Sequence, residues 1–232
     1  MAIAESCDVY FYDLARRLTI DRMYDYLYPY GFGDRTGVDT TSERPGVLPS
    51  TRWKREALAQ AWYPGETLSA GIGQGYVLAT PMQLAMATSV LASKGERRTP
   101  RLLKAIDGEP VVAPPLEPII ADEANWESVY DGMREVVHGK RGTAKKLSKG
   151  IAYEMAGKTG TAQVIGIAQN AVYNEDEVAE RHRHHGLFIA FAPLEAPTIA
   201  VAIIVENGGG SSAASPIARQ VIDTWLLGEE AG

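Results

Sequence analysis

The chain has 232 residues with 23 Lys or Arg and 29 Asp or Glu, which gives a formal net charge of −6 with histidine neutral. With 45% hydrophobic and 22% charged residues the composition excludes wholesale disorder. The acidic balance also argues against a nucleic-acid-binding protein, whose affinity comes largely from Lys and Arg on phosphates. No apolar run reaches the roughly 18 residues that span a bilayer, and we find no secretory signal at the N-terminus. We therefore expect a soluble chain.

Helices dominate the predicted elements of the first part. Apolar spacing predicts a helix over 9–19, and Asp21 would cap a second one that Pro29 and Gly31 end. Loop is expected over 31–49 and 62–70, with a short helix near 52–60 between them. Thr80 begins the best-marked helix, because Pro81 and Gln83 complete a capping signal. The remaining expectations are a short strand or hairpin and linker over 96–120, a helix over 122–138, and a basic stretch over 140–149.

Strands follow after residue 150. They are expected at 151–164, 187–192 and 198–205, the last two forming an antiparallel hairpin, before a hinge at 208–212. A final helix over 215–227 would carry an apolar stripe of Ile217, Val221 and Trp225. The pattern thus predicts an α+β fold. Residues 1–150 would form its mainly helical part, and 151–232 a three-stranded antiparallel sheet covered by a C-terminal helix of the same domain.

The sharpest chemical signal is Gly157-Lys158-Thr159-Gly160-Thr161 on a predicted strand. Lys158 supplies a fixed positive charge, Thr159 and Thr161 supply hydroxyls that can hold a carboxylate, and Gly160 allows close approach of a ligand or another backbone. This set suits an enzyme that docks an anionic peptide terminus along a strand edge.

Two alternatives for that motif stay open, namely a phosphate loop and an incidental Lys-Thr-Gly. The phosphate loop is disfavoured because Ala152 stands where it needs Gly, and because strand, not helix, follows. A second signal, Ser6-Cys7-Asp8, precedes a helix and taken alone favours a plain N-cap formed by Ser6 or Asp8. Unusual backbone angles are expected at Gly71-Ile72-Gly73-Gln74-Gly75. This run is not a dinucleotide-binding fingerprint, because that motif requires a preceding strand and none is predicted here.

Metal binding is not favoured. His182, His184 and His185 follow the charged segment 174–181, and neighbouring Arg side chains would repel a cation, so a solvated loop is expected. Cys7 is the single cysteine, which excludes an internal disulfide and a zinc finger from this chain alone. It is a weak metal candidate that would need upstream partners. We expect no cofactor and no metal.

Ser6-Cys7-Asp8 and Lys158-Thr159-Gly160, in this order, resemble the second and third motifs of the penicillin-binding protein transpeptidases. The chain resembles in particular the elongation-specific class B group, penicillin-binding protein 2. The resemblance covers about residues 4–228 and is carried by SCDVYFYDLARRLTIDRM, GFGDRTGVD, WYPGETLSAGIGQGYVLATPMQLA, GTAKK, GKTGTAQV, LFIAFAP and VENGGG. It implies the serine β-lactamase/transpeptidase-like fold.

One departure concerns the first motif of the family, S-x-x-K, which holds the nucleophile. No serine of the chain has Lys three residues later. Thr51 and Thr143 do, with Lys54 and Lys146, but the first lies in a predicted surface segment and the second in a basic turn. We therefore expect the C-terminal part of a transpeptidase domain, truncated before its nucleophile and inactive alone.

The resemblance also implies roles in acyl transfer through a serine ester. Ser6 would relay a proton to the leaving amine, Asp8 would orient it, and Lys158 would set the electrostatics and pair with Asp8. Thr159 and Thr161 would bind the terminal carboxylate beside Gly160, with the Thr161 N–H as half of the oxyanion hole.

The implied partners are the D-Ala-D-Ala stem peptide, β-lactams and membrane proteins of the elongation complex, at the periplasmic face of the inner membrane. Two other functions stay open. One is a serine β-lactamase or D,D-carboxypeptidase relative, although we find no motif for deacylation. The other is a non-catalytic module that binds peptide or β-lactam at the strand edge.

Overall fold

The computed structural model describes residues 1–112, 114–164 and 178–228, and the chain forms two compact units. The sheet unit contains residues 1–6 and the chain from 123 onward, and the helical unit contains residues 7–122. The division of one domain at residue 150 stays a prediction, because it describes a change in the type of element along the chain and not the packing. Among the described residues, no helix has both the length and the apolar character needed to cross a membrane.

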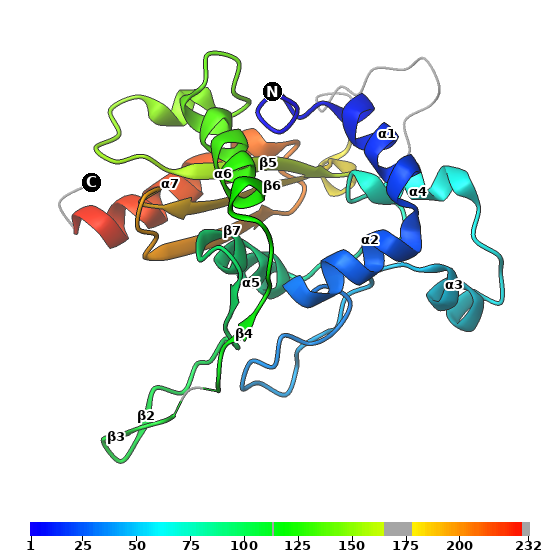
Figure 1. Ribbon diagram of the computed structural model, residues 1–232. Coiled ribbons are helices and arrows are strands. Elements are labelled where there is room, and N and C mark those ends of the chain that lie inside the picture. Colours follow the sequence, from blue (N-terminus) through cyan, green and yellow to red (C-terminus); the bar gives the residue numbers. More distant parts are fainter. Residues whose placement is uncertain (113, 165–177, 229–232) are drawn as a thin grey trace. The chain divides into compact units, whose positions relative to one another are not determined.

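The sheet unit is built on three antiparallel strands in the order β5-β6-β7 (Figure 1). Their bounds are β5 Ala156–Ala162, β6 His185–Ala192 and β7 Ile199–Val205. Helix α6 packs against β5, and helix α7 packs against β6 and β7. Within its described residues, this unit contains the helices α6 Glu123–His138, η2 Lys145–Ser148, η4 Glu180–His182 and α7 Ser211–Leu227. The predicted sheet with its C-terminal helix is confirmed.

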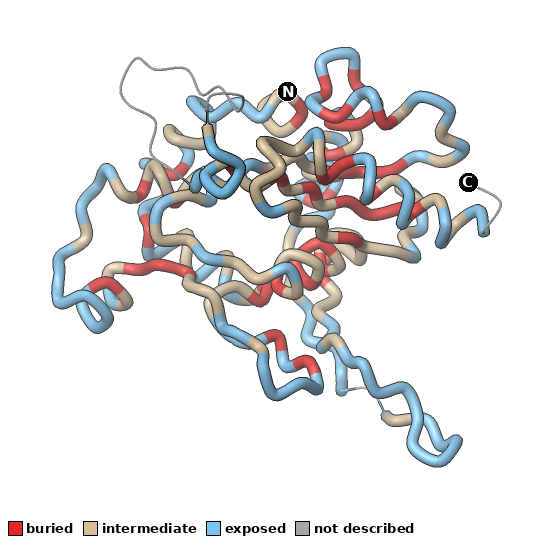
Figure 2. The backbone as a smooth tube through the Cα atoms, turned by 180° about the vertical axis from the view of Figure 1, so that it is seen from behind, coloured by how far each residue is buried: buried red, intermediate tan, exposed pale blue. Residues whose placement is uncertain are grey.

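An apolar core joins these elements. Phe188, Ala190 and Ala192 of β6 are fully buried, together with Val136 and Val137 of α6. Figure 2 shows buried backbone concentrated along the sheet. A rigid sheet held in this way gives β5 a fixed position for the side chains of its motif.

The helical unit contains the helices and short strands that precede residue 123. Its helices are α1 Asp8–Leu18, α2 Ile20–Leu27, η1 Tyr28–Tyr30, α3 Thr51–Leu58, α4 Pro64–Gly71 and α5 Pro81–Ala92. Its short strands are β1 Glu96–Arg97, paired with β4 Glu117–Pro118, and β2 Ala105–Ile106, paired with β3 Glu109–Pro110. Residues 96–112 and 114–120 form an arm that is mostly exposed (Figure 2).

Two of the predicted caps can be compared with the structure. The Thr80 hydroxyl accepts the Gln83 N–H at 3.1 Å and the Gln83 side chain accepts the Thr80 N–H at 2.9 Å, which confirms the capping signal. The cap predicted at Asp21 is wrong, because Thr19 is the N-cap of α2. The Asp21 carboxylate instead accepts the N–H and the hydroxyl of Thr51, at 2.8 and 2.7 Å.

The loop predicted over 62–70 is wrong, since most of it forms α4. Pro64 occupies the first helical turn and the Glu66 carboxylate accepts the N–H of Tyr63 at 2.8 Å, so the helix begins with a capping interaction. At its other end, a Cβ on Gly71 would lie 2.4 Å from Ala15 Cβ of α1. The glycine therefore allows α1 and α4 to pack closely.

The apolar stripe predicted on the last helix faces outward. Ile217, Val221 and Trp225 are 42%, 40% and 63% exposed, whereas Ala218 and Ile222 are fully buried. The N-terminus of α7 approaches the sheet closely: a Cβ on Gly186 of β6 would lie 2.0 Å from the carbonyl oxygen that precedes α7. Helix α7 thus buries the face that carries Ala214, Ala218 and Ile222, and the predicted stripe lies outside it.

Candidate active site

The Lys-Thr-Gly motif lies on β5, which pairs with β6 alone among the described strands and so forms a sheet edge. Lys158 is paired in register with Ile189, and Thr159 with the buried Phe188. The strand edge expected for this motif is therefore confirmed. Thr161 is exposed at the end of the strand, and Thr159 is half-buried.

Glycines let β5 lie flush against its neighbour. A Cβ on Gly157 would lie 2.6 Å from the Phe188 ring and 3.0 Å from the Ile189 carbonyl oxygen. A Cβ on Gly160 would meet the Leu187 Cβ at 3.2 Å. The spacing of these glycines thus reflects the packing of β5 on β6 as well as any need for ligand access.

Ser6 and Lys158 come together in the sheet unit. The Lys158 ammonium donates to the Ser6 hydroxyl at 2.9 Å and to the Thr159 carbonyl at 2.8 Å, and it lies 3.3 Å from the Thr159 hydroxyl. The proximity of Ser6 and Lys158 expected from the motifs is confirmed. Their catalytic roles stay predictions.

The segment before Ser6 is held in place by contacts with the rest of the sheet unit. Ala4 is buried, and its carbonyl accepts the Thr143 N–H at 3.2 Å. Ile3 packs against the core where Gly132 of α6 leaves no room for a side chain, since a Cβ there would lie 2.8 Å away. Glu5 pairs with Arg141 at 2.6 Å.

Ser6 has a left-handed backbone with φ of 52°. Few non-glycine residues adopt this conformation, which costs on the order of 1 kcal/mol and persists only where surrounding contacts hold it. The anchors on Ile3, Ala4 and Glu5 supply those contacts.

Thr143 is a member of the site that the sequence did not identify. Its hydroxyl lies 2.8 Å from the hydroxyl of Thr159. The turn that carries it is fixed to the end of α6, because the Ala144 N–H donates to the Val136 carbonyl at 2.9 Å, and a Cβ on Gly142 would lie 2.3 Å from that oxygen. The Gly142-Thr143-Ala144 sequence in the quoted stretch GTAKK was the available signal.

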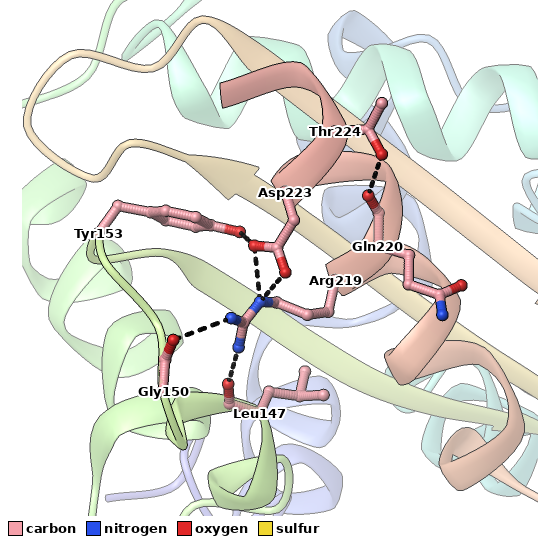
Figure 3. Close-up of polar contacts among 7 residues, drawn as sticks. All are labelled: Leu147, Gly150, Tyr153, Arg219, Gln220, Asp223 and Thr224. Atoms are coloured by element: carbon pink, nitrogen blue, oxygen red, sulfur yellow. Dashed lines mark hydrogen bonds and ion pairs between the residues drawn. The ribbon is translucent and has the colours of Figure 1, made fainter. Parts of the chain in front are cut away.

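The next turn is held by α7 (Figure 3). Arg219 donates to the Leu147 and Gly150 carbonyls at 2.5 and 3.4 Å and to the Asp223 carboxylate at 2.6 Å. Tyr153 donates to the same carboxylate at 2.5 Å. Burial, and then the Asp223 charge, raise the pKa of Tyr153, so its hydroxyl stays protonated as a donor. This network fixes the chain between Thr143 and β5.

Cys7 and Asp8 belong to the helical unit. Both are exposed, the N-cap of α1 is Cys7, and its side chain makes no capping hydrogen bond. The plain N-cap by Ser6 or Asp8 is therefore wrong. Pairing of Asp8 with Lys158 and metal binding by Cys7 stay predictions. Within residues 1–112, 114–164 and 178–228, no group of three or more His, Cys, Asp or Glu could hold a metal ion.

The solvated loop expected for the histidines is partly wrong. His182 is exposed in η4, but His184 is buried and its Nδ1 accepts the Val164 N–H at 3.2 Å. His185 begins β6, and its Nδ1 accepts the Asn207 N–H at 2.9 Å. Both rings therefore accept backbone N–H groups beside the start of β6. Residues 174–177 of the charged segment lie outside the described residues.

Comparison with known proteins shows the family of the chain. The model of the penicillin-binding protein transpeptidase domain matches residues 1–223. Peptidoglycan D,D-transpeptidase MrdA of Haemophilus influenzae is 40% identical over 97% of the chain, and MrdA of Acinetobacter baumannii is 42% identical over 97%. The chain covers 36% and 34% of these two relatives, so it spans about a third of their length.

Solved structures give the same result. Penicillin-binding protein 2 of Pseudomonas aeruginosa, in complex with WCK 5153, has a TM-score of 0.87 and 49% identity, over 99% of this chain and 49% of that one. Penicillin-binding protein 2 of Helicobacter pylori, in complex with MreC, has a TM-score of 0.83 and 34% identity, over 98% and 40%. The chain therefore belongs to the penicillin-binding protein transpeptidase family, with the penicillin-binding protein 2 transpeptidases as its relatives.

Proposed function

We propose that the chain supplies the leaving-group and carboxylate-binding side of a peptidoglycan D,D-transpeptidase site. The contact between the Lys158 ammonium and the Ser6 hydroxyl carries this proposal, because a hydroxyl that accepts from an ammonium is a group whose proton affinity is electrostatically controlled. The exposed edge of β5 beside it offers backbone groups and threonine hydroxyls to an extended peptide.

The reaction is acyl transfer. A serine nucleophile attacks the amide between the two terminal D-Ala residues of a stem peptide, the terminal D-Ala leaves as an amine, and a second peptide amine attacks the resulting ester. Ser6 would pass the proton to the departing amine, and Asp8 would orient Ser6 and the substrate. Lys158 would hold Ser6 and attract the substrate's terminal carboxylate, consistent with its position between Ser6 and Thr159.

Thr159 and Thr161 would bind that carboxylate, with Gly160 between them allowing the peptide to approach. The Thr161 N–H would donate to the oxyanion of the tetrahedral intermediate. A β-lactam would occupy the same positions, because its carboxylate and its strained amide present the same two groups.

The nucleophile would come from a segment that the 232 residues do not contain, since none of their serines has Lys three positions later. The chain alone would then form no acyl-enzyme. The complex of the Helicobacter pylori relative with MreC supports a protein partner for the complete protein. The complete protein would work at the periplasmic face of the inner membrane, with membrane proteins of the elongation complex.

Labelling with a fluorescent penicillin tests this proposal. The 232-residue chain is compared with an extended chain, in which the preceding part of the transpeptidase domain of Pseudomonas aeruginosa penicillin-binding protein 2, including S-x-x-K, is joined ahead of residue 1. We expect covalent label on the extended chain alone. Label on the shorter chain would reveal another nucleophile, and an unlabelled, folded extended chain would contradict the proposed function.

A further inference from the structure

A chain of polar contacts in the sheet unit extends one residue beyond the recognised motifs. It runs from the Ser6 hydroxyl through the Lys158 ammonium to the Thr159 hydroxyl, and then to the hydroxyl of Thr143. Thr143 lies 16 positions before Thr159, in the turn after α6. The proposed function does not use it.

The number of hydrogen bonds that the Thr159 hydroxyl can make suggests a role for Thr143. A threonine hydroxyl has one proton to donate and two lone pairs that accept, whereas an ammonium only donates. The Lys158 ammonium, 3.3 Å away, therefore occupies one lone pair of Thr159. If the Thr143 hydroxyl, 2.8 Å away, donates as well, both lone pairs are occupied and the Thr159 proton must point to a third atom.

A carboxylate is a ligand that fits a Thr159 hydroxyl whose proton points away from Lys158 and Thr143. An ionised carboxylate accepts and never donates, so it binds Thr159 only through the Thr159 proton. The opposite direction, in which Thr159 donates to Thr143, would leave a lone pair facing the anion.

The backbone around Thr143 is built to hold its hydroxyl in place. Its own N–H donates to the Ala4 carbonyl, and the next N–H donates to the Val136 carbonyl of α6. The turn is thus fixed both to the segment that carries Ser6 and to a core helix. An exposed threonine anchored on two sides is more restrained than its exposure alone would indicate.

We propose that Thr143 is a positioning residue that donates to Thr159 and thereby directs the Thr159 proton toward the terminal carboxylate of a peptide ligand. The inference rests on the proposed function, since it assigns Thr159 to that carboxylate. It predicts selectivity for a free carboxylate over a neutral amide at the edge of β5.

The test uses the 232-residue chain and two probes, N-acetyl-D-alanyl-D-alanine and its C-terminal amide. Binding is measured from the backbone amide NMR shifts of residues 159–161. Thr143→Val removes the hydroxyl at nearly constant shape, and Thr143→Ser retains it. Thr224→Val is the matched control, because that exposed threonine donates to the Gln220 carbonyl within α7.

We expect the wild type to bind the acid more tightly than the amide. Thr143→Val should weaken acid binding by about three- to tenfold, the range of one hydrogen bond, without changing amide binding. Thr143→Ser and Thr224→Val should keep the wild-type preference. Wild-type acid affinity in Thr143→Val, or equal losses for both probes, would overturn the role of Thr143. Failure of the wild type to bind the acid would instead contradict the proposed carboxylate site itself.

Discussion

The Ser6 hydroxyl accepts a hydrogen bond from the Lys158 ammonium at 2.9 Å, although 152 positions separate the two residues. The contact is built from local anchors on α6 and the turn that follows it. Gly132 makes space for Ile3, Thr143 binds the Ala4 carbonyl, and α6 packs against the strand that carries Lys158. These contacts therefore determine the geometry of the candidate site.

Gly157→Ala should destabilise the chain. The added methyl would lie 2.6 Å from the Phe188 ring and 3.0 Å from a backbone oxygen, so β5 must shift from β6. Overpacking of this kind costs about 1–3 kcal/mol in the free energy of unfolding. Urea denaturation measures it. Gly65→Ala is the control, because nothing lies within 4 Å of its added Cβ, and it should leave stability unchanged or raise it by up to about 1 kcal/mol. Equal effects of the two changes would contradict the proposed fit of β5.

Arg219→Leu should cost more than the loss of a surface ion pair. The side chains of Arg219 and Asp223 are 17% and 16% exposed, and removal of the guanidinium also leaves the Leu147 carbonyl without that donor. We expect a loss of about 1–3 kcal/mol by urea denaturation. Arg17→Leu breaks a pair whose side chains are 70% and 45% exposed, and it should cost at most about 0.5 kcal/mol. Similar values for both variants would show that the α7 network does not stabilise the turn.

The free energy of unfolding should fall as the pH is lowered into the range in which His138 takes up a proton. Its Nε2 accepts the Met155 N–H at 3.1 Å just before β5, and burial lowers its pKa below the ordinary 6.5. The unfolded chain then binds more protons, so stability is fully present above the unfolded pKa and declines as the pH drops below about 6.5. Unfolding free energies at pH 7.5, 6 and 5 should decline less steeply in His138→Gln, where an amide oxygen accepts instead. His182→Gln, at an exposed position, should follow the wild type, and a steep decline in His138→Gln would assign the effect to another group.

Asp8→Asn in the extended chain should change the pH profile of acylation by penicillin. If Asp8 pairs with Lys158, the carboxylate stabilises the ammonium, and its removal changes the charge beside Ser6. Pre-steady-state labelling between pH 5 and 10 measures this. Asp25→Asn, at another exposed carboxylate of the helical unit, is the control. A profile unchanged by Asp8→Asn would exclude the pair.

The order of the sequence motifs predicted the contact between Ser6 and Lys158 correctly. The periodicity of apolar residues was a poorer guide to how the helices pack. Ser6 and Lys158 could be paired through resemblance to a family, since no local pattern connects them. The sequence did not identify Thr143 as a site residue, because a threonine in a basic turn belongs to no periodic pattern and its partner Thr159 lies on another element.

Helix α7 and helix α4 show two further limits of sequence patterns. Hydrophobicity ranks Ile217, Val221 and Trp225 above alanine, but α7 turns the face with Ala214, Ala218 and Ile222 toward the sheet, and its N-terminus approaches Gly186 too closely for a side chain there. In α4, Pro and Gly at adjacent positions favour loop, whereas the carboxylate of Glu66 caps the helix. In α7 the packing on the sheet decides against the apolar pattern, and in α4 a local capping interaction decides against the loop signal of Pro and Gly.

The rate of fluorescent penicillin labelling in Lys158→Met of the extended chain tests the central claim most directly. The substitution removes the ammonium that contacts Ser6 and keeps an unbranched side chain on β5. Electrostatic stabilisation of this kind contributes on the order of 100-fold, so we predict a fall of that size in the acylation rate. Lys146→Met, an exposed lysine that also ends the Thr143-x-x-Lys146 pair, should label at the wild-type rate. Wild-type labelling by Lys158→Met, with its fold intact, would contradict a transpeptidase site built on Ser6 and Lys158.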